Sequence, residues 1–67
     1  MKVFRNRGCG QCILLEEKNG IMLIAAIERN EYIVAAGPLD ASGSWTWGSY
    51  HKTLDEAKDD YDTKTRR

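Results

Sequence analysis

The sequence predicts a single α+β domain: an antiparallel β-meander of four to five strands with one C-terminal helix packed on one face. Three observations predict this fold. The chain has 67 residues, which suffice for one domain over residues 1–67. Turn signals separate short runs of β-branched and aromatic residues. Near the C-terminus, a helix-capping sequence precedes apolar residues at helical spacing.

The first hairpin is predicted from Asn19-Gly20, which lies between two apolar runs. An Asn-Gly pair readily adopts the positive φ angles of the tight hairpin turn that matches strand twist. We therefore expect Cys12–Glu17 to pair with Ile21–Glu28.

Two further strands follow the polar pair Arg29-Asn30. Glu31–Ala36 has the composition of a strand, and Gly37-Pro38 should end it because proline has no amide hydrogen for the ladder. Asp40–Ser44 is then expected to be a loop, and Trp45–Tyr50 the next strand.

The helix is predicted from a capping box. The Thr53 hydroxyl should accept the amide of Glu56, while the Glu56 carboxylate reaches back to the amide of Thr53. Leu54, Ala57 and Tyr61 form one narrow apolar stripe, which we expect to face the sheet.

The segment Ile21–Ile27 is apolar on both sides, which is typical of a strand buried on both faces. Ile21, Leu23, Ala25 and Ile27 alternate with Met22, Ile24 and Ala26. One short helix covers one side of a sheet only. We expect a second copy of the chain to cover the other side in a homodimer, with a curled, partly closed barrel or a diluted exposed face as the alternatives.

Charge and composition restrict the function classes. The formal net charge is zero, so the whole molecule has no general attraction to nucleic acid or membrane. We find no membrane-spanning run and no signal-peptide pattern, and therefore expect a cytoplasmic protein whose cysteines are thiols.

Cys9 and Cys12 have the spacing of half a zinc site or of a redox pair. His51 is the lone histidine, so a zinc site would lack a ligand unless two chains shared it. We interpret the cysteines as incidental thiols in a tight loop and expect no cofactor. No partner for general acid–base chemistry can be assigned to His51, so we do not expect an enzyme.

Trp45 and Trp47 should share one face of their strand, with Tyr50 on the other. The tryptophans suit a core or dimer interface or, together with Tyr50, the centre of a protein-binding site. Alternatively, they could stack single-stranded bases while basic residues near the chain ends hold the phosphates; these are Lys2, Arg5, Arg7, Arg66 and Arg67.

The helix carries regularly placed carboxylates, among them Asp55, Asp59 and Asp62. Such a row can imitate the phosphate charge of DNA and occupy the basic groove of a nucleic-acid-binding enzyme. The plainer interpretation is a solvated helix face.

The stretch Tyr32–Tyr61, with Trp45-Thr46-Trp47-Gly48-Ser49-Tyr50 and Thr53-Leu54-Asp55-Glu56-Ala57, resembles small orphan proteins of phages and mobile elements of Gram-positive bacteria. Some proteins of that kind block host defences, including anti-CRISPR proteins. One group has a fold similar to the transcriptional-coactivator type of single-strand-binding protein, which implies a dimer of strand-rich subunits closed by helices.

The leading hypothesis is a homodimeric accessory protein that binds a host or phage protein and inhibits a nucleic-acid-targeting defence enzyme. The alternatives are a single-stranded nucleic-acid-binding protein and a small zinc-stabilised structural protein centred on Cys9 and Cys12.

Overall fold

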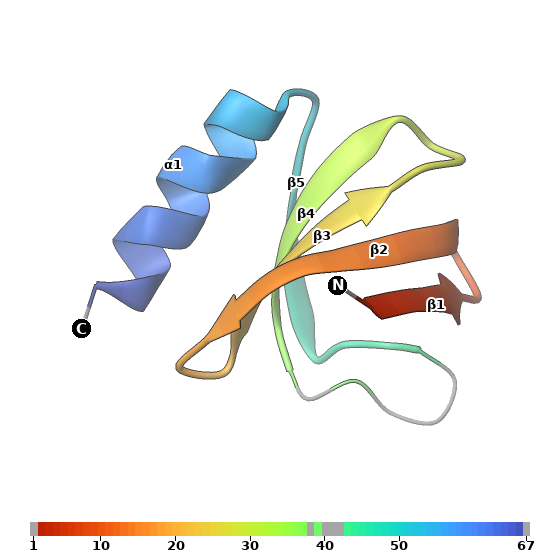
Figure 1. Cartoon of the computed structure of the whole chain (residues 1–67), viewed down its shortest axis with the longest axis horizontal. Coiled ribbons are helices and arrows are strands. Elements are labelled where there is room, and N and C mark those ends of the chain that lie inside the picture. The colour runs from red at the N-terminus through yellow and green to blue at the C-terminus, as the bar shows by residue number, and fades with distance from the viewer. Residues whose placement is uncertain (1, 38, 40–42, 67) are drawn as a thin grey trace.

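The computed structural model describes residues 2–37, 39 and 43–66. It contains five strands and one helix, in the chain order β1 (Lys2–Asn6), β2 (Gly10–Lys18), β3 (Ile21–Ala26), β4 (Glu31–Ala36), β5 (Trp47–His51) and α1 (Leu54–Thr65). The strands form one antiparallel sheet in sequence order, and α1 packs across β3, β4 and β5 (Figure 1). The predicted fold class is confirmed. Strand β1 was not located from the sequence.

The predicted Asn19-Gly20 turn is confirmed. Asn19 and Gly20 have φ angles of 54° and 78°, and Lys18 pairs with Ile21 across the two-residue loop. Strand β3 ends at Ala26, earlier than predicted, because residues 27–30 form the turn to β4. The bounds of β4 agree with the prediction.

Strand β5 was predicted to begin at Trp45, but it begins at Trp47. Gly43, two residues before Trp45, instead lies against β1, where the Asn6 side chain donates to the Gly43 carbonyl at 2.8 Å. Pro38 and residues 40–42 of the predicted turn and loop lie outside the described residues. Trp45 therefore precedes the strand, and the prediction that Trp45 and Trp47 share a strand face is wrong.

Of the two hydrogen bonds predicted for the cap of α1, the structure contains one. The Thr53 hydroxyl accepts the Glu56 amide at 3.2 Å, and the Glu56 carboxylate accepts from that hydroxyl instead of from the Thr53 amide. Ala57 and Tyr61 are buried as predicted, but Leu54 is 38% exposed because it lies in the first turn. With 12 residues, many of them charged, α1 cannot span a bilayer, and it is the one helix of the described residues.

Strand β3 is buried on both sides, as predicted. On one side, Leu23 and Val34 pack with Ala57 and Tyr61; we call this the helix-side cluster. On the other side lies the underside cluster, which consists of Cys9, Cys12, Met22, Ile24, Ala26, Ile33 and Ala35. Two apolar layers therefore share one central strand.

The underside cluster is covered by the chain itself. Phe4 and Leu14 pack against it from β1 and β2, and Leu39 and Trp45 pack against it from the β4–β5 connection. Part of this cover is the β4–β5 connection, and the sheet itself is open, with β1 and β5 at its two edges. Burial of the second face therefore requires no sister subunit. The homodimer stays a prediction, without the burial argument that led to it.

Candidate binding surfaces

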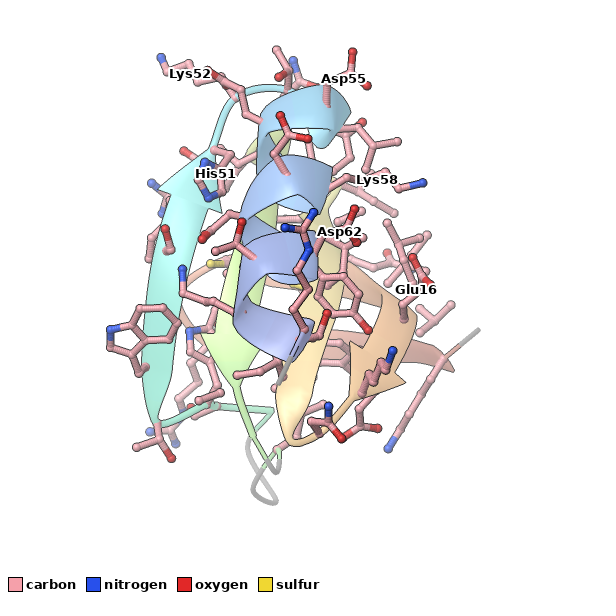
Figure 2. All side chains as sticks on the ribbon, turned by 90° about the vertical axis from the view of Figure 1, so that its left-hand side faces the viewer. Glu16, His51, Lys52, Asp55, Lys58 and Asp62 are labelled. Atoms are coloured by element: carbon pink, nitrogen blue, oxygen red, sulfur yellow. The ribbon has the colours of Figure 1, made fainter. Side chains whose placement is uncertain are left out.

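Asp55, Asp59 and Asp62 are all exposed on α1. Residues three and four apart lie on one side of a helix. At about 1.5 Å per residue, the row covers roughly 10 Å of the helix axis. Glu16 of β2 pairs with Leu23 and so lies on the helix side of the sheet, where it borders this row (Figure 2). We call these four carboxylates the acidic surface.

Tyr61, which is buried under α1, is close enough to the carboxylates of this surface for their charge to affect its hydroxyl group. The pKa of Tyr61 is raised, first by burial and then by the negative charges of Glu16, Asp62 and Glu17. Carboxylates from α1 and β2 therefore act on the same point. Lys58, which is exposed, is the basic side chain within the row (Figure 2).

A second group of polar side chains joins β5 to α1. His51 Nε2 lies 2.9 Å from Asp60 Oδ2 and 3.2 Å from Ser49 Oγ. Lys64 donates to the other Asp60 oxygen. Burial of the Asp60 carboxyl opposes its ionisation, but the hydrogen bonds from Lys64, His51 and Ser49 together with the charge of Lys64 outweigh burial and lower the pKa of Asp60.

Ser49, His51 and Asp60 do not have the geometry of a catalytic triad. In a triad, one ring nitrogen of histidine faces the nucleophile and the other faces the carboxylate. Here both partners meet the same nitrogen, Nε2. We therefore interpret the group as a link between strand and helix. Sequence reasoning assigned no partner to His51, because Asp60 reaches it only through the packing of α1 on β5.

Trp45 and Tyr50 line a pocket of about 450 Å³ on the underside of the sheet. The rest of its wall comes from the β1–β2 turn, the β3–β4 connection and the segment before Trp45: Asn6, Gly8, Cys9, Arg29, Glu31 and Ser44. Gly48 makes room for Trp45, because a Cβ at this position would lie 2.7 Å from Trp45 Nε1. We call this site the aromatic pocket.

Trp47 lies on the opposite face of β5. Its ring is 46% exposed, and Lys64 Nζ of α1 stands 4.7 Å from the ring centroid. The side chains predicted to bind a partner thus occupy different places. Asp55, Asp59 and Asp62 lie on the outer side of α1, Trp47 beside α1, and Trp45 and Tyr50 on the underside.

The basic residues of the nucleic-acid alternative do not form one surface. Arg5 and Arg7 line a hollow that shares Asn6 with the aromatic pocket. Lys2 lines a different hollow beside Leu14, and Arg66 is the C-cap of α1. Arg67 lies outside the described residues.

Cys9 and Cys12 are free thiols that are 7% and 0% exposed. Burial, followed by the charges of Cys9 and Glu28, raises the pKa of Cys12 and so disfavours the thiolate needed for redox chemistry. Over residues 2–37, 39 and 43–66, no three His, Cys, Asp or Glu side chains come together as a metal site. The placement favours core packing for both thiols.

Asn6 is a structural residue that sequence reasoning missed. Its Oδ1 accepts the amides of Gly8 and Cys9 at 2.8 and 2.9 Å, and its Nδ2 donates to Gly43. The local signal was an Asn followed by a glycine-containing turn, since Asn often bonds the backbone two residues further on.

A scan of protein-family models, a search of curated proteins and a search of solved structures each gave no match to this chain.

Proposed function

We propose that this chain is a small non-catalytic accessory protein of a phage or mobile element, which acts in the cytoplasm by binding and inhibiting a host nucleic-acid-targeting protein. The observation that supports this proposal is the acidic surface: Asp55, Asp59 and Asp62 lie exposed on one side of a helix, and Glu16 extends the negative charge onto β2. A basic groove that accommodates nucleic acid is the surface complementary to such a row.

The fold suits this form of inhibition because it holds the carboxylates on a rigid element. Ala57 and Tyr61 fix α1 on the sheet through the helix-side cluster, and the link from His51 to Asp60 holds the helix against β5. A charged surface that is already ordered loses little conformational entropy on binding. Complementary charge also accelerates encounter with a partner, and salt weakens this effect.

Paired charge variants test the proposal. Asp59→Asn with Asp62→Asn removes two charges from the acidic surface and leaves the Thr53–Glu56 cap intact. Glu28→Gln with Glu31→Gln is the charge control, because it removes the same charge from the turn after β3 and the start of β4. Since these carboxylates pair with Arg5 and Arg29, the circular dichroism spectrum of this variant is first compared with that of the wild type. Each immobilised protein is exposed to a lysate of a Gram-positive bacterium, the kind of host that the resemblance implies. Bound proteins are then displaced with duplex DNA.

We expect the wild-type chain to retain a nucleic-acid-binding protein that duplex DNA releases. With that protein purified, the Asp59/Asp62 variant should bind about tenfold more weakly, which corresponds to about 1.4 kcal/mol or roughly 0.7 kcal/mol for each charged contact. The control variant should bind like the wild type. Retention that DNA does not reverse, or equal affinity of the two variants, would contradict the proposal.

A further inference from the structure

The aromatic pocket lies away from the acidic surface and has a different composition. In Figure 1, α1 stands at one end of the molecule, while the β1–β2 and β3–β4 turns, which bring Gly8 and Arg29 to the pocket, lie at the other end. The two sites therefore need not share a ligand.

Two neighbouring rings form the apolar part of the pocket. Trp45 lies against Gly48, and Tyr50 follows two residues later on the same face of β5. Trp45 is partly buried against the underside cluster, which fixes its ring, whereas Tyr50 is 55% exposed. A planar aromatic ligand can stack on such side chains whatever its substituents.

Cationic donors stand at the rim of the pocket. Arg29 donates from one terminal nitrogen to the Gly8 carbonyl at 3.3 Å, and its Nε lies 3.9 Å from Glu31. A guanidinium carries five N–H donors, so Arg29 keeps donors for a ligand. Arg7 lines the adjoining hollow and is exposed, and among the described residues it has no ion-pair or hydrogen-bond partner. These groups suit a phosphate.

The rim is also ordered before any ligand arrives. Asn6 is 8% exposed, and its bonds to Gly8, Cys9 and Gly43 hold the β1–β2 turn against the segment that leads to Trp45. A volume of about 450 Å³ is within the usual range for sites of small ligands.

We infer that the aromatic pocket binds a nucleotide unit, with the base stacked on Trp45 and Tyr50 and the phosphate held by Arg29 and Arg7. This chemistry is offered by a free nucleotide and by a single strand of nucleic acid. The inference is independent of the proposed function, because it uses no residue of the acidic surface.

The two tryptophans allow a direct test. Trp47→Phe leaves Trp45 as the sole tryptophan, and Trp45→Phe leaves Trp47 alone. Each protein is titrated with thymidine monophosphate, with thymidine and with an eight-residue thymidine oligonucleotide, while tryptophan fluorescence is recorded. We expect saturable quenching of Trp45 by the two phosphorylated ligands, weaker binding of thymidine, and no saturable quenching of Trp47.

Variants at the pocket supply the second readout. Tyr50→Ala should weaken binding about tenfold, the loss expected for one stacked base. Arg7→Gln should also weaken binding and, for the oligonucleotide, reduce the slope of log affinity against log salt by about 0.7. Lys58→Gln on the helix is the charge control and should change neither the affinity nor its salt dependence. Because Tyr50 and Arg7 are exposed, these variants should keep the wild-type circular dichroism spectrum.

The series of ligands distinguishes a free nucleotide from a single strand of nucleic acid as the natural ligand. Equal affinity for mononucleotide and oligonucleotide identifies a free-nucleotide site, whereas tighter binding of the oligonucleotide identifies a single-strand site. The inference is overturned if Trp45 is not quenched at millimolar ligand, if Trp47 responds equally, or if Tyr50→Ala binds like the wild type.

Discussion

Asn6→Ala should destabilise the fold more than the size of the side chain suggests. Asn6 makes three hydrogen bonds to backbone groups, at 2.8, 2.8 and 2.9 Å. The Gly8 amide lies near solvent and can bond water after the substitution, whereas Cys9 and Gly43 are buried. At about 1 kcal/mol for each lost bond, with more for the buried groups, the free energy of unfolding should fall by about 3 kcal/mol.

That loss is large for this chain, because 67 residues give a total stability of roughly 3–10 kcal/mol. Urea unfolding followed by circular dichroism measures the change, and amide hydrogen exchange should show faster exchange at Cys9. Gln11→Ala is the control, since Gln11 is exposed on the adjacent strand and should change stability by about 0.5 kcal/mol or less. A loss below about 1 kcal/mol for Asn6→Ala would refute the assigned role.

Two further predictions concern β5 and its link to α1. Gly48→Ala should lower the free energy of unfolding by about 1–3 kcal/mol, because the new Cβ would lie 2.7 Å from Trp45 Nε1 and force the ring to move. Urea unfolding measures the loss, and the Trp45 emission should shift in the Trp47→Phe background. Unchanged emission would contradict the prediction. The pKa of Asp60 is lower in the folded chain than its ordinary value of 3.8, so its contribution to stability should be complete above about pH 4 and be lost as the pH falls through the folded pKa. Thermal unfolding between pH 6 and pH 2.5 should show that loss in the wild type and a smaller one in Asp60→Asn.

Local patterns predicted most of the secondary structure. The Asn19-Gly20 turn and strand β4 were found because their signals lie within a few adjacent residues. The Thr53 cap likewise depends on an interaction over three residues. The alternation along β3 also predicted two buried faces correctly, because each face is apolar in its own right.

The errors involve contacts between distant parts of the chain. Asn6 and Gly43 are 37 residues apart, and their bond accompanies the displacement of Trp45 from the predicted strand. Periodicity along Trp45–Tyr50 carries no information on that bond, so it placed Trp45 and Trp47 on the same face. The cover over the underside cluster also comes from segments distant in sequence, so the apolar pattern of β3 alone predicted a second chain as the cover.

The sequence identified several residues of the candidate sites, but it did not show which of them lie together in space. Asp55, Asp59 and Asp62 do form one exposed row, since helical spacing alone determines it. Tyr50 and Trp45 were both named, but they were expected on opposite faces and instead line the same pocket. Arg29, which lines that pocket, was missed because its neighbours come from the β1–β2 turn.

The position of β3 at the centre of the sheet has a consequence for aggregation. Its sequence, Ile21–Ala26, is uncharged, apolar and free of proline and glycine, which are the properties of segments that assemble into intermolecular sheets. Both of its edges are occupied, by β2 and β4, while the outermost strands β1 and β5 are five residues long and carry Lys2, Arg5 and His51. Fraying of either outer strand leaves β3 paired, so only more extensive unfolding offers this segment to another molecule.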